Sequence, residues 1–163
     1  KSINRPGWIS IAGITFYNTN IFLNNCHFKN SYNEDLMGII NSDFQINNIT
    51  FENSFSDSLD IDFSKGIINK VDFYNSSNDS LDISGSNVSI NYLNVNNAGD
   101  KGVSVGEDSY VQISNSNIIN SNIGLVSKDG SHVFIDNIKF HNNHIPHFHL
   151  HIHHRYYLLQ QKF

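Results

Sequence analysis

Apolar and polar residues alternate in short runs along this chain, and one such run returns almost unchanged. The sequence DSLDID at residues 57–62 recurs as DSLDIS at residues 79–84, which is 22 residues later. Alternation of this kind predicts a short β-strand with one face in a core and the other face outside it. A fixed period of this length indicates a repeat architecture. We therefore expect a solenoid whose coils stack strand upon strand.

The same frame can be followed through six consecutive repeats. Each repeat carries three pairs of inward positions, most of them apolar, and equivalent positions are 22 or 23 residues apart. The first pair runs from Ile14 and Phe16 in the first coil to Leu125 and Ser127 in the sixth. Three pairs per repeat predict three short strands per coil, which fits a parallel β-helix.

Asparagine marks one corner of every repeat. It follows the third pair by two residues, at Asn30, Asn53, Asn75, Asn97, Asn120 and Asn142. Stacked asparagine side chains can hydrogen-bond to one another and to turn backbone, and so pair polar groups that would otherwise be buried alone. The predicted fold is therefore all-β, a parallel β-helix of about six coils over residues 13–143 with an asparagine ladder. We expect an irregular lead-in over residues 1–12, with a turn at Pro6-Gly7, and an atypical His-rich tail over residues 144–163.

Three segments of the repeat resemble a known superfamily. They are residues 13–16, 78–86 and 99–107, which read GITF, NDSLDISGS and GDKGVSVGE. They are similar to the right-handed parallel β-helix (pectin-lyase-like) superfamily, and most closely to β-helix segments that accompany bacterial CotH-kinase-like surface proteins. The resemblance covers about residues 13–143. It implies a right-handed coil, and it leaves the activity open because one fold hosts many functions.

The charges are unevenly distributed along the chain. All 15 acids fall between Glu34 and Asp136, where only four lysines oppose them. This acidic segment repels phosphate backbones, and we therefore expect no nucleic-acid partner. Metal cations, or a ligand bridged by them, are more compatible. We also expect no membrane-spanning segment, because no apolar run is long enough to cross a bilayer.

The recurring aspartates form the main candidate site. Strand alternation places Asp60, Asp62 and Asp82 outward on stacked coils, and Asp57 and Asp79 lie at the turn that precedes each strand. Hard cations such as Ca²⁺ prefer several carboxylate oxygens, so a calcium site is one interpretation. A second is catalysis by paired carboxylates. A third is a solvated face on which aspartate serves as a turn former.

Lys101 replaces the first aspartate of the repeat one coil further on. The resemblance to lyases and epimerases implies that a basic residue beside bound Ca²⁺ can abstract the C5 proton of a sugar. The candidate catalytic residues are then Lys101, Asp82 and Asp60. An ion pair between Lys101 and Asp79 is the alternative role that we favour.

Histidines in the tail form a second candidate metal site. They alternate with apolar residues at His147, His149, His151 and His153, so a strand would place four imidazoles on one face. Such a row could bind Zn²⁺, Cu²⁺ or Ni²⁺. No carboxylate or cysteine accompanies them, and we favour an atypical end of the chain over a physiological metal site.

These patterns predict a non-catalytic binding or structural module that is carbohydrate-associated and carries an acidic, Ca²⁺-binding stripe. The alternative is a polysaccharide lyase or uronan C5-epimerase that acts through the stripe and Lys101. The chain begins Lys1-Ser2-Ile3, and we expect it to belong to a longer secreted or surface protein with companion domains. A polysaccharide is the expected partner.

Overall fold

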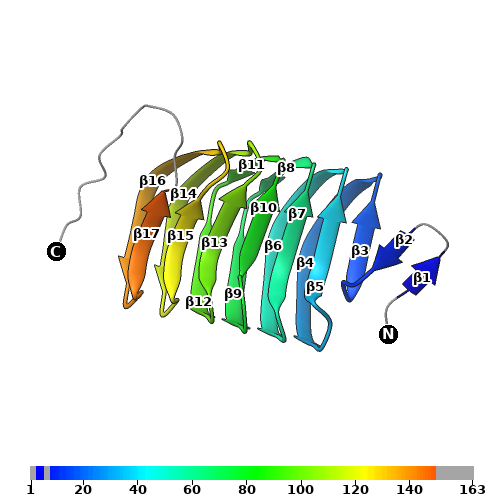
Figure 1. Cartoon of the computed structure of the whole chain (residues 1–163), viewed down its shortest axis with the longest axis horizontal. Coiled ribbons are helices and arrows are strands. Elements are labelled where there is room, and N and C mark those ends of the chain that lie inside the picture. Colours follow the sequence, from blue (N-terminus) through cyan, green and yellow to red (C-terminus); the bar gives the residue numbers. More distant parts are fainter. Residues whose placement is uncertain (1–2, 6–7, 150–163) are drawn as a thin grey trace.

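The computed structural model describes residues 3–5 and 8–149, and it shows a solenoid of about six stacked coils (Figure 1). None of these residues is helical. A seven-stranded parallel sheet takes one strand from each coil: β3 (Ile14–Tyr17), β5 (Asp35–Ile40), β7 (Asp57–Asp62), β10 (Leu81–Ser84), β13 (Lys101–Gly106), β15 (Ile123–Ser127) and β17 (Ile145–His149). The expected parallel β-helix is thus confirmed.

An eight-stranded parallel sheet forms the rest of each coil. Its strands are β4 (Asn20–Ser31), β6 (Asp43–Ser54), β8 (Lys65–Ile68), β9 (Val71–Ser76), β11 (Asn87–Ile90), β12 (Leu93–Ala98), β14 (Tyr110–Ile119) and β16 (His132–His141). The expected second and third strands of the coil remain separate only in β8–β9 and β11–β12. Elsewhere they join into one long strand.

Asparagine explains where these two strands join. Asn25, Asn48, Asn115 and Asn137 lie at the bend inside β4, β6, β14 and β16, and all four have a positive φ of 47–54°. Asparagine tolerates this left-handed conformation better than other non-glycine residues. Lys70 and Tyr92 occupy the same place in the other two coils, where φ is not positive and the strand is interrupted.

The core follows the register that the sequence repeat predicts. Leu59 pairs with Leu81, which pairs with Val103, and all three side chains are fully buried. On the other sheet, the rings of Phe28, Phe51 and Phe73 stack with centroids 5.5 and 5.2 Å apart. Because each side chain packs on its equivalent in the next coil, every repeat buries its apolar face only through its neighbours.

The predicted asparagine ladder is present. Asn53, Asn75 and Asn97 each donate from Nδ2 to Oδ1 of the ladder asparagine one coil earlier, at 3.0–3.1 Å. Asn120 departs from the pattern and donates to Asn96 instead of Asn97. The ladder residues are exposed and have φ between 53 and 72°. The expectation that they pair buried groups is therefore wrong: they allow a left-handed turn and stack on the surface.

Serine forms a buried ladder that the sequence reading missed. The side chains of Ser42, Ser64, Ser86, Ser109 and Ser131 lie at the turn after the seven-stranded sheet and are buried. Each hydroxyl accepts a hydrogen bond from the backbone N–H of the equivalent residue one coil earlier, for example Ser64 N–H to Ser86 Oγ at 2.9 Å. These hydroxyls accept hydrogen bonds from backbone N–H groups inside the corner, which water does not reach.

Both ends of the solenoid differ from expectation. The lead-in contains an antiparallel pair, β1 (Ile3–Arg5) and β2 (Trp8–Ser10), where an irregular segment was expected. The sheet also continues beyond residue 143, because Ile145–His149 pairs in parallel with β15. His147 is therefore the register partner of Leu125. Pro6-Gly7, His151 and His153 lie outside the described residues. In the described ranges, the structure contains no helix capable of crossing a membrane.

Candidate functional site

The acidic site lies on the outer face of the seven-stranded sheet. Leu59 and Ile61 of β7 point into the core, so the alternating Asp60 and Asp62 face outward. Parallel register places Asp60 beside Asp82 of β10. The short repeat thereby converts aspartates 22 residues apart in the chain into neighbours on adjacent coils.

Three of the five predicted aspartates converge. Ligand oxygens of Asp57, Asp79 and Asp82 all lie within 4.8 Å of one another. Asp79 is only 3% exposed, and Ser104, the register partner of Asp82, is completely buried. Asp57 and Asp82 are half-buried, so like charges meet here where only part of the surrounding water is excluded.

Two of these aspartates also have a structural role. Oδ1 of Asp57 accepts two hydrogen bonds, one from the backbone N–H of Asp79 at 2.9 Å and one from Nδ2 of Asn78 at 2.7 Å. In the next coil, Oδ1 of Asp79 accepts a hydrogen bond from the backbone N–H of Lys101 at 2.9 Å. One carboxylate oxygen of each residue thus supports the turn.

Two atoms of the site are buried without a hydrogen-bond partner. They are Oδ1 of Asp82 and Oγ of Ser104, and they are the two such side-chain atoms found among the described residues. A buried polar atom without a partner costs free energy and calls for an explanation, of which a bound water or ion is one. Both belong to neighbouring residues on β10 and β13, beside the converging carboxylates.

The electrostatics of the sheet face favour protonation or a bound cation. Burial, together with the negative charges of Asp62 and Asp35, raises the pKa of Asp60 to about 8. Burial and the charge of Asp57 raise the pKa of Asp35 to about 7, and burial raises the pKa of Asp79 to about 6. A divalent cation would relieve the repulsion among these groups without protonating them.

Lys101 is the one cation directly paired with the cluster in the described structure. Its Nζ lies 3.3 Å from Oδ1 of Asp79 and 2.5 Å from Oδ2 of Asp100. Burial lowers the pKa of Lys101, but the hydrogen bond to Asp100 and the charge of Asp79 outweigh this effect, and the net pKa is raised. The predicted ion pair with Asp79 is thus present. A lysine held protonated in this way is a poor general base.

Sequence reasoning missed two members of the site. Asp35 is the register partner of Asp57 and is 8% exposed; its equivalent place in the repeat was visible in the sequence. Ser104 gave no such signal, because a serine on an outer strand position is ordinarily exposed. Its burial emerges only from the packing of adjacent coils.

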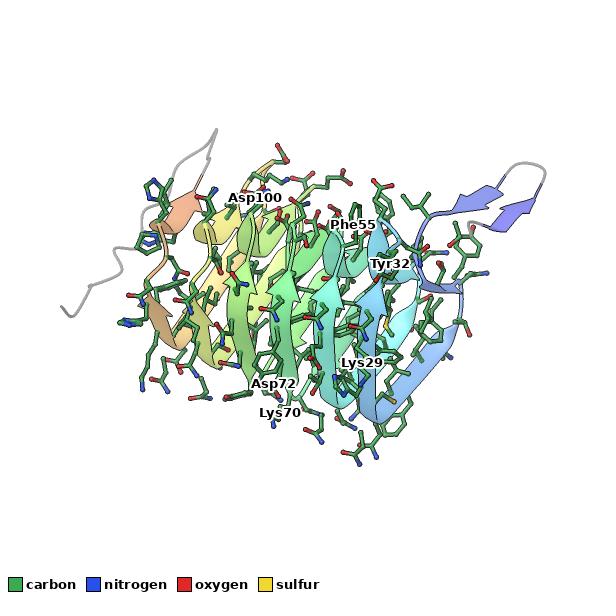
Figure 2. All side chains as sticks on the ribbon, turned by 90° about the horizontal axis from the view of Figure 1, so that it is seen from below. Lys29, Tyr32, Phe55, Lys70, Asp72 and Asp100 are labelled. Atoms are coloured by element: carbon green, nitrogen blue, oxygen red, sulfur yellow. The ribbon has the colours of Figure 1, made fainter. Side chains whose placement is uncertain are left out.

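Exposed aromatic residues lie at the corners of the solenoid. Tyr32 and Phe55 occupy equivalent turns before β5 and β7, along the same edge of the solenoid as Asp100 in Figure 2. Phe63 lies in the turn after β7 and is 61% exposed.

Comparison with known proteins adds nothing to the geometry. No protein-family model, no curated protein and no solved structure matches the chain. The fold defines the class, a parallel β-solenoid with an asparagine ladder, and the function has to be argued from the site.

Proposed function

We propose that this chain is a non-catalytic β-solenoid module that binds a divalent cation, Ca²⁺ by its donor chemistry, on the outer face of the seven-stranded sheet. The observation that carries the proposal is the pair of buried atoms without partners, Asp82 Oδ1 and Ser104 Oγ, beside the carboxylates of Asp57 and Asp79. Hard oxygen donors in this number suit Ca²⁺, which takes six to eight oxygen ligands.

The remaining ligands would come from Asp60, from water or from a bound molecule. Carboxylate and hydroxyl groups of an acidic polysaccharide are suitable donors, and a cation shared between module and polymer would overcome the repulsion between two anions. The pectin-lyase-like and CotH-associated resemblance supports this carbohydrate association and a secreted or surface location for a longer protein. Asp57 has a second oxygen, Oδ2, beside the one that supports the turn. Oδ2 of Asp79 accepts a hydrogen bond from Lys101 Nζ at 3.4 Å, so a cation there would have to displace the ammonium group.

The alternative, a polysaccharide lyase or uronan C5-epimerase, has weaker support. It requires a base that can accept the C5 proton. Lys101 is engaged by Asp79 and Asp100, and its pKa is raised. Turnover of a uronan that disappears in Lys101→Ala would favour the enzyme instead.

Calcium titration tests the proposed function. A ligand that binds only the folded state raises its melting temperature, by several degrees at about 100 times Kd. We expect this rise for the wild type and for Asp136→Asn, which removes an exposed acid on β16. Asp60→Asn combined with Asp82→Asn should abolish the rise. An equal response in all three proteins, each checked for β-structure by circular dichroism, would reject the cation site.

A further inference from the structure

A groove runs along the corner at which the chain leaves the seven-stranded sheet. Its volume is about 790 Å³, and five successive coils line it, from Asn18 to Tyr110. These turns follow the arrowheads of β3, β5, β7, β10 and β13, along the upper edge of the solenoid in Figure 1. Five coils at a spacing of about 4.8 Å give it a length of roughly 19 Å. The groove therefore suits an extended chain lying parallel to the solenoid axis.

One row of turn residues in this corner has left-handed backbone. The row is Asn18, Asn41, Phe63, Gly85, Glu107 and Asp129, with φ between 47 and 60°. Asparagine, glycine and aspartate are the usual residues for this conformation, whereas a bulky aromatic is an outlier there. Strained residues of this kind concentrate at functional sites, and the inference runs from the outlier to a role.

The ring of Phe63 is not held there by burial. It is 61% exposed and lies over Gly85, where a Cβ would come within 2.5 Å of its Cδ1. The absent side chain at Gly85 makes room for the ring on the next coil. The corner thus presents an accessible phenyl ring at the middle of the groove, in a backbone conformation that asparagine would adopt more easily.

Polar groups surround this ring. Asn41 donates to Asn18 at 3.3 Å, and both residues line the groove with Asn87 and Tyr110, each of them exposed. Amide, hydroxyl and aromatic groups together match a sugar, whose C–H face stacks on a ring while its hydroxyl groups donate and accept hydrogen bonds. The charged lining residues are Asp43, Asp108 and Lys65. Their net negative charge disfavours an anionic chain.

We propose that this groove binds a neutral polysaccharide, with one pyranose ring stacked on Phe63 and its neighbours along the solenoid axis held by asparagine amides. This site goes beyond the cation site of the outer sheet face. It is built from other residues and needs no metal ion.

Affinity electrophoresis tests the proposal. Gels contain EDTA and one soluble neutral polysaccharide each: a β-glucan, a xylan, a galactomannan or an arabinogalactan. We expect at least one polymer to retard the wild type, with the dissociation constant raised about tenfold or more in Phe63→Asn, as for loss of a central aromatic contact. The matched control is Phe55→Asn, which removes an aromatic residue of similar exposure from the opposite corner and should bind like the wild type.

Phe63→Asn is designed to keep the fold, because asparagine suits the left-handed turn at this position. We expect its melting temperature to stay within a few degrees of the wild-type value. Absence of retardation in every gel, equal losses in Phe63→Asn and Phe55→Asn, or undiminished binding by Phe63→Asn would each overturn the proposal. A large fall in melting temperature would also overturn it, since the ring would then be structural. Because EDTA removes free calcium, each outcome is independent of the cation site.

Discussion

Asparagine provides both the turn geometry and the surface stacking of this solenoid. At each ladder position it takes a positive φ, and at Asn53, Asn75 and Asn97 its amide donates to the ladder asparagine of the preceding coil. These two properties rarely coincide in another side chain: glycine allows the turn but has no amide, and glutamine has the amide but resists the left-handed backbone. This double demand in successive coils accounts for part of the high asparagine content of the chain, 26 of 163 residues.

Asn75→Leu tests the role of the ladder. Leucine resists φ near 57° and cannot replace the bonds to Asn53 and Asn97. We expect the free energy of unfolding to fall by about 1–3 kcal/mol, measured by urea denaturation. The control is Asn94→Leu, on the outer side of β12, with an expected change below about 0.5 kcal/mol. Equal losses would mean that the ladder does not contribute specifically.

At the scale of elements, the apolar pattern predicted much of the fold. The inward pairs, the six coils and the parallel stacking are all determined by hydrophobic alternation, which sequence displays directly. The joining of β6 into one strand and the break between β8 and β9 depend on a single asparagine or lysine at the bend, a signal too local for a hydrophobic pattern. The serine ladder was hidden for another reason: serine reads as a turn residue whether its hydroxyl points out or in.

Ser86→Ala tests the buried serine ladder. It removes the acceptor of the Ser64 N–H and the hydroxyl that donates to the carbonyl of Ser84. An unpaired buried amide should lower the free energy of unfolding by about 1–3 kcal/mol. Ser89→Ala, on the outer side of β11, should change it by less than about 0.5 kcal/mol. If the two variants unfold at the same urea concentration, the hydroxyl is not needed at that corner.

At the scale of the whole molecule, stacking concentrates charge. Each coil contributes few acids, but parallel register collects them on one face, where Asp35 and Asp60 acquire pKa values of about 7 and 8. Sequence could predict this alignment, since it follows from the period of 22. It could not predict the burial of Asp79 and Ser104 or the missing partner of the Ser104 hydroxyl, which arise from how the neighbouring coils pack.

The raised pKa values make stability depend on pH. The folded state holds protons more tightly than the unfolded chain, so protonation of Asp60 contributes to the free energy of unfolding. That contribution is complete below about pH 4 and is lost as pH rises through the folded pKa of Asp60, about 8. In EDTA, we expect the wild-type melting temperature to fall between pH 5 and 9 by at least about 3 °C more than that of Asp60→Asn. Calcium should reduce the difference. Parallel curves in EDTA would show that Asp60 ionises normally.

We propose above that oxygens of the acidic face bind a cation. The most direct measurement is an anomalous difference map from crystals soaked in Tb³⁺, a luminescent stand-in for Ca²⁺ with the same preference for oxygen. We expect a strong peak about 2.3–2.6 Å from carboxylate oxygens of Asp57, Asp79 and Asp82, within reach of Ser104. A map with no peak among these residues, and with water bonded to Asp82 Oδ1 instead, would contradict it.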